Sequence, residues 1–397
     1  MESEAKCPCC FSKKIKGFFK LKNVPVNSVL NIKKFEEAVN FTRGNISLGF
    51  CRNCGFIYNT EYNPELVQYS PDCEESQGFS PTFNAFAKEL AAELIEKYHL
   101  YNKKVVEIGC GKGEFLKLLC DIGQNQGVGF DPAYLPGRGE ENFSDRVTFI
   151  KDYYSKRYSN YHGDMICCRM TLEHIHNPAE LVNTVRLSIR DQKNTVVFFQ
   201  VPDVVRIIRD SAFEDIYYEH CSYFSTGSLA RLFRSSGFDI LDLRKVYNEQ
   251  YIMIENKLAV EETPGRMPLE DDLQLLEEQV TRFGNAYPIA LQYWQEKLEK
   301  IRKAGKKAVI WGSGSKGVTF LTSLPNSDFI EYAVDINPYR QGTFMAGSGK
   351  AIVEPGFLKT YRPDVVIIMN AVYREEIQRD LSKMELEPLV LALGENN

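Results

Sequence analysis

The chain has 397 residues, which is enough for two or three domains. Its apolar content of 44% and its charged content of 25% are those of an ordinary globular protein, so they exclude wholesale disorder. Its net charge of −5 gives no electrostatic support for a nucleic-acid-binding or membrane-binding protein.

Nor does the sequence predict a membrane or secreted protein. Its strongest apolar run, at residues 196–199, is far shorter than the roughly 18 residues of a membrane-spanning helix. The first six residues include acids and form no apolar signal segment. The 11 cysteines are spread along the chain and do not form the dense pattern of a disulfide scaffold. We therefore expect a cytoplasmic protein with no membrane partner.

Composition and motifs divide the chain into four blocks. We place a small zinc-binding domain at 1–75, an α/β domain at 76–256, a connecting helical segment at 257–304 and a second, Rossmann-like α/β domain at 305–397. The observations behind each block follow in chain order.

Two Cys-x-x-Cys pairs mark the first block. Cys7 and Cys10 form one pair, Cys51 and Cys54 form the other, and a glycine suited to a tight turn follows Cys54. Two such turns can place four thiolates in a tetrahedron around Zn²⁺, with Cys9 as a bystander. Four thiolates leave no open coordination position, so we predict a structural zinc site. A set of reduced, buried cysteines is the alternative.

Residues 76–256 alternate between helical and strand-like patterns, which is typical of a parallel sheet flanked by helices. The apolar spacing predicts a helix over 84–98 and a short strand over 104–108. Further strands are predicted at 127–130, 147–150, 165–168 and 195–200, followed by a helix over 228–235. The last two strands, 237–243 and 250–255, are too close for a parallel crossover and should pair antiparallel. Such a sheet favours a methyltransferase fold over a plain dehydrogenase domain.

A glycine-rich turn follows the strand at 104–108. Gly109, Gly111 and Gly113 let the backbone approach a ligand closely. This G-x-G-x-G spacing differs from the G-x-G-x-x-G of dinucleotide sites and resembles motif I of class I S-adenosylmethionine (SAM) methyltransferases. The next strand leads to Asp131, 18 residues after Gly113, where a carboxylate can accept both ribose hydroxyls. We predict a SAM site, with a vestigial site as the alternative. Its candidate residues are Glu107, Gly109, Cys110, Gly111, Gly113, Asp131 and, at the adenine edge, Asp152.

The fourth strand is followed by Leu172-Glu173-His174-Ile175-His176-Asn177-Pro178. The two histidines suggest a metal site, but the sequence offers no evident third ligand. The segment resembles the Leu-Glu-His-Ile-x-x-Pro stretch that borders the cofactor in many SAM methyltransferases. We therefore expect His174 and His176 to have a cofactor-lining or structural role.

The segment Tyr217-Tyr218-Glu219-His220 concentrates two phenols, a carboxylate and an imidazole in one loop. His220 is the natural general base near neutral pH, and Glu219 beside it can orient the ring or raise its pKa. A tyrosine hydroxyl can hydrogen-bond the oxygen of a developing enolate. The loop would otherwise be an aromatic segment that packs over the sheet, with an incidentally satisfied histidine.

Residues 257–304 include a long charged stretch, which predicts a connecting helix with a solvated face that ends near Lys303. A second α/β unit starts with a strand at 307–311 and carries a G-x-G-x-x-G turn from Gly312 to Gly317. Asp335 follows the next strand, where a ribose-binding acid would lie. The pattern formally predicts a dinucleotide site, but no second catalytic set accompanies it. A glycine loop that serves architecture or a substrate's phosphates is the preferred interpretation.

Taken in order, these features resemble the three-domain sugar C-methyltransferases, which methylate nucleotide-linked (dTDP) keto-deoxysugars. The most specific matches are Cys51-Arg52-Asn53-Cys54-Gly55-Phe56, Tyr217-Tyr218-Glu219-His220 and Trp311-Gly312-Ser313-Gly314-Ser315-Lys316-Gly317. The resemblance implies bound SAM and structural zinc, with His220 as the base, Tyr217 as its partner and Glu219 as the accompanying acid. The chain departs from the family over 13–45 and over 69–80, where the family places substrate contacts.

The expected reaction is C-methylation of a small molecule, a nucleotide-linked sugar. A base removes a proton from a carbon next to a ketone, and the resulting enolate attacks the methyl group of SAM. Three other functions fit parts of the sequence. They are an O- or N-methyltransferase with the same cofactor half, an NAD(P)-dependent oxidoreductase that uses the second glycine loop, and a zinc-containing nucleic-acid module that uses the lysines between residues 13 and 34. We expect no nucleic-acid partner.

Overall fold

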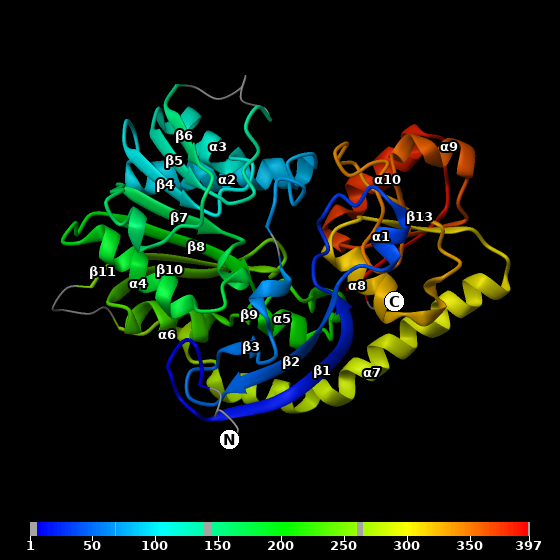
Figure 1. The fold of residues 1–397 in the computed structure, drawn as a ribbon, viewed down its shortest axis with the longest axis horizontal. Coiled ribbons are helices and arrows are strands. Elements are labelled where there is room, and N and C mark those ends of the chain that lie inside the picture. Colours follow the sequence, from blue (N-terminus) through cyan, green and yellow to red (C-terminus); the bar gives the residue numbers. More distant parts are fainter. Residues whose placement is uncertain (1–5, 68, 139–144, 260–264, 396–397) are drawn as a thin grey trace.

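Three β-sheets form in the part of the chain that the computed structural model describes, residues 6–67, 69–138, 145–259 and 265–395. Figure 1 shows the middle unit on the left, the C-terminal unit on the right, and strands β1 and β2 running below and between them. Residues 1–5, most of the segment considered as a signal, lie outside these ranges. Every helix within the ranges is too short or too polar to cross a bilayer.

The N-terminal sheet is antiparallel and includes a strand from a distant part of the chain. Its order is β1 (Ile15–Pro25), β2 (Arg43–Cys51), β3 (Ile57–Asn59) and β9 (Ser222–Tyr223), with helix α1 (Phe35–Val39) between β1 and β2 in sequence. Tyr223 pairs with Ile57, and Ser222 pairs with Tyr58. The loop that contains His220 is therefore anchored to the N-terminal sheet.

The middle sheet has seven strands in the order β10-β11-β8-β7-β4-β5-β6. Strands β4 to β8 run parallel, and β11 runs antiparallel to both of its neighbours. The strands are β4 (Lys104–Ile108), β5 (Gln126–Phe130), β6 (Val147–Ile150), β7 (Met165–Arg169), β8 (Val196–Pro202), β10 (Phe238–Val246) and β11 (Tyr251–Leu258). The helices of this unit are α2 (Pro81–Tyr98), α3 (Glu114–Gly123), α4 (Pro178–Ile189), α5 (Val204–Arg209) and α6 (Thr226–Ser235).

Two local predictions for this sheet can be compared directly with the structure. The antiparallel pairing of the last two strands is confirmed, because residues 247–250 leave room only for a turn between β10 and β11. The helix predicted at 84–98 begins three residues earlier, at Pro81, where Ser80 Oγ accepts a hydrogen bond from the Phe83 amide at 3.2 Å. Apolar spacing misses this start because a cap and a proline carry no helical periodicity.

The C-terminal unit contains a fully parallel five-stranded sheet. Its order is β14 (Ala351–Val353), β13 (Tyr332–Val334), β12 (Ala308–Trp311), β15 (Val365–Ile368) and β16 (Leu389–Ala392). Helices α8 (Ser315–Ser323), α9 (Leu358–Tyr361) and α10 (Arg374–Lys383) belong to the same unit. Numbered from the start of the unit, the strand order is 3-2-1-4-5, which is a Rossmann-like arrangement.

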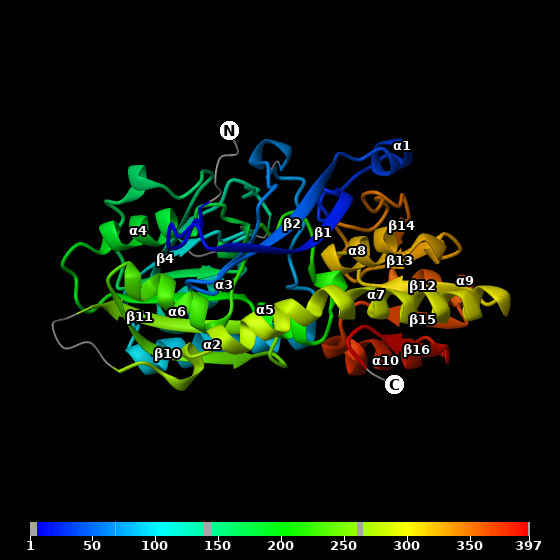
Figure 2. The ribbon, with the colours of Figure 1, turned by 90° about the horizontal axis from the view of Figure 1, so that it is seen from below.

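The long helix α7 (Leu273–Lys303) joins the units through a buried stripe. Figure 2 shows α7 running past α5 and along the C-terminal unit. Phe283 and Tyr287 pack on Phe19 of β1, with ring centroids 5.2 and 4.6 Å apart, and Trp294 packs on Phe320 of α8 at 5.3 Å. Besides its charged face, the helix thus has an apolar face. This face packs against β1 of the N-terminal unit and α8 of the C-terminal unit, so it spans the expected domain boundaries. The divisions at residues 75, 256 and 304 stay predictions.

Candidate active site

The first glycine loop follows β4 and has the backbone of a ligand cradle. Gly109, Gly111 and Gly113 have φ angles of +68°, +54° and +84°. A Cβ on Gly109 would lie only 2.0 Å from Thr171 Oγ1. This clash and the positive φ angle both favour glycine at this position. Gly113 immediately precedes α3, whose N-terminus therefore faces the loop.

Asp131 and Asp152 follow the two neighbouring strands, β5 and β6. The Asp131 carboxylate accepts hydrogen bonds from the Gly111 amide at 2.9 Å and from the Ala133 amide at 2.7 Å. Asp152 accepts one from the Tyr158 hydroxyl at 2.5 Å. Because β4, β5 and β6 are adjacent and parallel, both acids and the glycine loop lie at one edge of the sheet.

Glu107 and Cys110 flank the start of the same loop and are both buried. Glu107 Oε2 has no hydrogen-bond partner among the described residues, and burial raises the pKa of this carboxyl to about 8. Cys110 packs so tightly on β5 that a Cβ on Gly129 would lie 2.7 Å from its sulfur. The glycine cradle, the acid at the β5 end and this orphaned carboxylate oxygen fit a bound SAM.

His220 lies in the loop before β9 and pairs with Tyr217. His220 Nε2 and the Tyr217 hydroxyl are 2.9 Å apart. Burial and the neighbouring His174 hold the pKa of His220 well below 6.5, whereas the sequence suggested that Glu219 would raise it. The Glu219 carboxylate instead accepts hydrogen bonds from the Ser28 amide at 2.6 Å and the Ser28 hydroxyl at 2.8 Å. Glu219 therefore has its hydrogen bonds with the N-terminal unit, not with the imidazole.

The acid beside His220 is Glu173, which sequence reasoning did not select. Glu173 Oε1 is 4.0 Å from His220 Nε2, and neither carboxylate oxygen has a hydrogen-bond partner among the described residues. Burial raises the pKa of Glu173 to about 8. Glu173 belongs to the Leu-Glu-His motif, but the sequence pattern suggested roles only for the histidines of that motif.

His174 joins this group, whereas His176 does not. The rings of His174 and His220 are 4.8 Å apart, and His174 Nδ1 lies 2.9 Å from the Tyr69 hydroxyl. His176 is exposed. Glu173, His174 and His220 are close enough to surround a cation, but the two imidazoles already have tyrosine hydroxyls as partners. Thr171, which contacts Gly109, connects this histidine group to the cofactor cradle.

The second glycine loop packs against the loop that contains His220. Lys316 Nζ lies 2.8 Å from Asp215 Oδ2, and the Ser28 hydroxyl, which donates to Glu219, accepts a hydrogen bond from the Ser315 hydroxyl at 2.7 Å. The C-terminal unit thus forms one side of the histidine site.

The expected ribose acid of this second loop already has internal partners. Asp335 Oδ2 accepts hydrogen bonds from the Ser313 amide at 3.0 Å and the Ser313 hydroxyl at 2.5 Å. The buried guanidinium of Arg340 donates to the Ser313 carbonyl and hydroxyl, both at 2.7 Å. The Asp335 contact with its loop resembles that of Asp131 with the first loop, whereas the Arg340 contacts brace the second loop from within, as in an architectural role.

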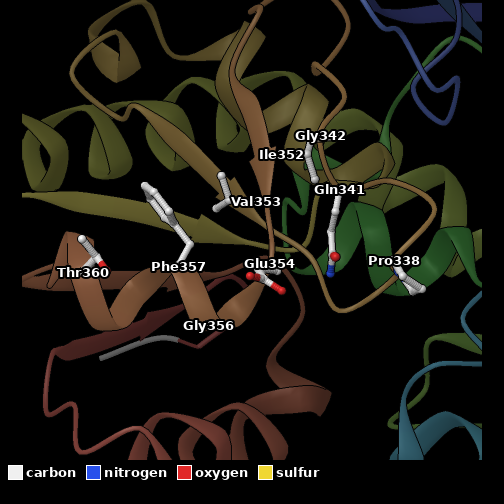
Figure 3. Close-up of a pocket in the computed structure, with 9 residues that line it drawn as sticks. All are labelled: Pro338, Gln341, Gly342, Ile352, Val353, Glu354, Gly356, Phe357 and Thr360. Atoms are coloured by element: carbon white, nitrogen blue, oxygen red, sulfur yellow. The ribbon is translucent and has the colours of Figure 1, made fainter.

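A separate open cavity of about 720 Å³ lies on the C-terminal unit (Figure 3). It is lined by Pro338, Gln341, Gly342, Ile352, Val353, Glu354, Gly356, Phe357 and Thr360. None of these residues belongs to the histidine group or to the first glycine loop, so the cavity is not the reaction site.

Four cysteine sulfurs meet in the N-terminal unit. The sulfurs of Cys7 and Cys54 are 3.6 Å apart, as are those of Cys10 and Cys51, and all four lie within 4.8 Å of one another. Cys9 is outside this group. Four convergent free thiols fit a tetrahedral structural zinc ion.

Comparisons with known proteins identify the type of enzyme. A methyltransferase domain model matches residues 83–243, and a C-methyltransferase C-terminal domain model matches residues 269–387. The C-methyltransferase NovU of Streptomyces niveus is 26% identical over 292 residues, which are 69% of this chain and 67% of NovU. These matches support a SAM-dependent methyltransferase enzyme and, more narrowly, a C-methyltransferase.

Solved methyltransferase structures are also similar to part of the chain. The 1,6-didemethyltoxoflavin-N1-methyltransferase of Burkholderia thailandensis covers 44% of this chain and 79% of its own, with a TM-score of 0.35 and 15% identity. The magnesium protoporphyrin IX methyltransferase of Synechocystis PCC 6803 covers 45% of this chain and 84% of its own, with a TM-score of 0.35 and 14% identity.

Proposed function

We propose that this chain removes a proton from a carbon next to a ketone, on a nucleotide-linked keto-deoxysugar, and methylates the resulting enolate with SAM. The observation that carries the proposal is the buried His220–Tyr217 pair, which packs on His174. The His174 amide donates to the Thr171 carbonyl at 3.0 Å, and Thr171 contacts Gly109 of the first glycine loop. A base and a methyl donor in one site are what carbon methylation requires. Similarity to a C-methyltransferase supports the same reaction type.

A C–H group has no lone pair, so it must lose its proton before it can act as a nucleophile. A neighbouring ketone acidifies the C–H bond, and a neutral imidazole can accept the proton. His220 takes this role because its depressed pKa leaves the ring neutral at pH 7. The Tyr217 hydroxyl stabilises the enolate oxygen or orients the imidazole. Glu173 lies 4.0 Å from His220, but burial raises its pKa to about 8, so it is mostly protonated at pH 7 and the imidazolium that forms would favour its ionisation.

Gly109, Gly111 and Asp131 would hold SAM, with Glu107 and Asp152 at the ends of the neighbouring strands. When bound, SAM supplies an electrophilic methyl group. The chain's own contribution is to fix both reactants in one cleft, which removes much of the entropic cost of their encounter. Cys7, Cys10, Cys51 and Cys54 would hold zinc, which stabilises the fold and takes no part in the reaction.

A phosphate-bearing substrate is supported by the second glycine loop. The loop precedes α8, and its Lys316 is paired with Asp215 in the chain segment that leads to His220. If the keto group of the substrate lies beside His220, the rest of the substrate would lie near the backbone amides of the second glycine loop and near the Lys316 ammonium group.

The proposed function predicts proton exchange even without the methyl donor. We would incubate the protein in heavy water with a panel of dTDP-4-keto-6-deoxyhexoses, with and without SAM, and follow substrate mass. Deuterium uptake without SAM and methyl gain with SAM are expected. If the protein binds SAM but neither signal occurs, the keto-sugar assignment is wrong and O- or N-methylation of another small molecule takes its place. Turnover with NAD(P)H and no need for SAM would overturn the methyltransferase mechanism.

The acid limb of the kcat/KM profile is expected to lie below pH 6.5. Protonation removes the base, and the pKa of His220 is held well below 6.5 by burial and by His174. Activity should therefore persist as the pH falls through 6.5 and decline only below it. Burial raises the pKa of Glu219 to about 7, so Glu219→Gln is measured in parallel. A limb at or above pH 6.5 in both proteins would contradict a depressed pKa at His220.

A further inference from the structure

A short segment of the N-terminal block, residues 73–76, crosses the first glycine loop. Lys112 of the loop donates to the Cys73 carbonyl at 2.9 Å and to the Ala133 carbonyl at 3.0 Å. Ser76 donates to Glu114, the first residue of α3, at 2.5 Å. The segment is therefore attached to the loop on both sides of its two glutamates, Glu74 and Glu75.

Glu74 fixes the same segment to the other units. Its carboxylate pairs with Arg138, which follows the Asp131 turn, and accepts a hydrogen bond from Asn337 Nδ2 of the C-terminal unit at 2.9 Å. Its carbonyl accepts from the Arg340 guanidinium at 2.9 Å. With Glu74 fixed in this way, the next side chain along the chain has a defined direction.

That next side chain, Glu75, faces the glycine loop. A Cβ on Gly111 would lie 3.0 Å from Glu75 Oε1, and Lys112 Nζ is 3.7 Å away. The Glu75 side chain keeps 41% of its surface accessible, so it borders open space and is not packed in the core. The Glu75 carboxyl group is thus presented at a loop whose backbone allows close approach of a ligand.

The surroundings disfavour a negative charge at this position unless a cation is present. Partial burial of Glu75 disfavours its charged form, and Asp131 and Glu74 repel a negative charge on it. Lys112 opposes these effects but gives two of its protons to carbonyl oxygens. The net result raises the pKa of Glu75 to about 7. A ligand that brings positive charge to the loop would reverse this balance.

We propose that Glu75 is a cofactor-binding residue whose carboxylate accepts hydrogen bonds from the α-ammonium group of SAM. This inference rests on the proposed SAM-dependent function. SAM carries two cationic groups, the ammonium and the sulfonium, and only the ammonium has N–H donors that match a carboxylate. The sulfonium methyl must also face the substrate beside His220. His220 is connected to Gly109 through His174 and Thr171, whereas Glu75 meets the loop at Gly111.

Three ligands separate the two cationic groups. SAM has both, S-adenosylhomocysteine has only the ammonium, and 5′-methylthioadenosine has neither. For Glu75→Gln we expect the affinities for SAM and S-adenosylhomocysteine to fall by about 10- to 100-fold, as when a charge-assisted hydrogen bond is lost. The affinity for 5′-methylthioadenosine should stay unchanged. Calorimetric titration of the purified full chain measures all three, with the exposed Glu65→Gln as the matched control.

The wild-type protein gives an independent test that needs no variant. Binding of a cation favours ionised Glu75, so S-adenosylhomocysteine affinity should rise with pH through about 7. Binding should release protons, so the observed binding enthalpy should vary with the ionisation enthalpy of the buffer. The neutral ligand should show neither effect, and Glu75→Gln should lose both.

Each of the other outcomes would contradict a specific part of the proposal. Weaker SAM binding with unchanged S-adenosylhomocysteine binding would make the sulfonium the partner and overturn the ammonium assignment. An equal loss for all three ligands would reduce Glu75 to a structural residue. Unchanged binding in Glu75→Gln would remove it from the cofactor site. If the wild-type protein bound none of the three ligands, SAM dependence itself would fail, which distinguishes this result from a failure at Glu75 alone.

Discussion

Replacement of His220 by alanine or asparagine is expected to lower turnover by about 10²- to 10⁴-fold, the usual contribution of a general base. SAM binding should persist, because the proposed cofactor residues, the glycine loop and Asp131, do not include the imidazole. The asparagine side chain can still donate and accept hydrogen bonds as the imidazole does, but it cannot take a proton from carbon at neutral pH. Both variants should therefore lose the reaction to a similar extent, although asparagine disturbs the loop less.

The readout that isolates proton removal is deuterium exchange of the keto-sugar in heavy water without SAM. This signal should vanish in both His220 variants together with methyl transfer. His176→Asn is the matched control, because His176 is exposed, lies in the neighbouring motif and is outside the histidine group. Near-normal exchange in His220→Ala would assign the base to another residue. Lost methylation with retained exchange would make His220 a binding residue.

Sequence reasoning located the elements that depend on local pattern. The strand at 104–108 matches β4, and the strands near 127–130, 147–150 and 165–168 match β5, β6 and β7 to within a residue. These strands are short apolar runs between glycines and polar turns, so their own composition defines them. The glycine loop and Asp131 were found for the same reason, because both follow directly from a strand end.

Contacts between segments that lie far apart in the sequence could not be predicted from local sequence patterns. No strand was predicted in the N-terminal block, yet it contains the 11-residue strand β1, whose polar and aromatic residues alternate irregularly. Nothing in the sequence places Ser28 against Glu219, a separation of 191 residues. The position next to His220 in sequence suggested that Glu219 orients the ring, but the turn into β9 directs Glu219 to Ser28 and leaves Glu173 beside the imidazole.

Loss of the four-cysteine site is expected to have the largest effect on stability. In Cys51→Ser, the remaining three thiolates should fail to retain zinc, and Tm should fall by about 10 °C or more, because metal binding contributes directly to folding free energy. Cys51 ends β2, and Cys54 precedes β3, which pairs with β9. Arg231 of α6 also donates to the Cys54 carbonyl at 2.9 Å. Metal loss should therefore loosen the strand that fixes His220.

This coupling predicts that zinc content, Tm and activity change together. Zinc is measured by mass spectrometry, Tm by scanning calorimetry and activity by methyl transfer. Cys9→Ala is the control, because its sulfur is outside the group of four, and it should retain about one zinc ion per chain. Chelated wild-type protein should recover all three properties when zinc is returned, whereas Cys51→Ser should not.

If Cys51→Ser kept its zinc, the metal would not be bound by these four cysteines. Zinc loss with unchanged activity would show that β9 holds His220 without help from the metal, and the proposed link between the cysteine site and the reaction would be wrong.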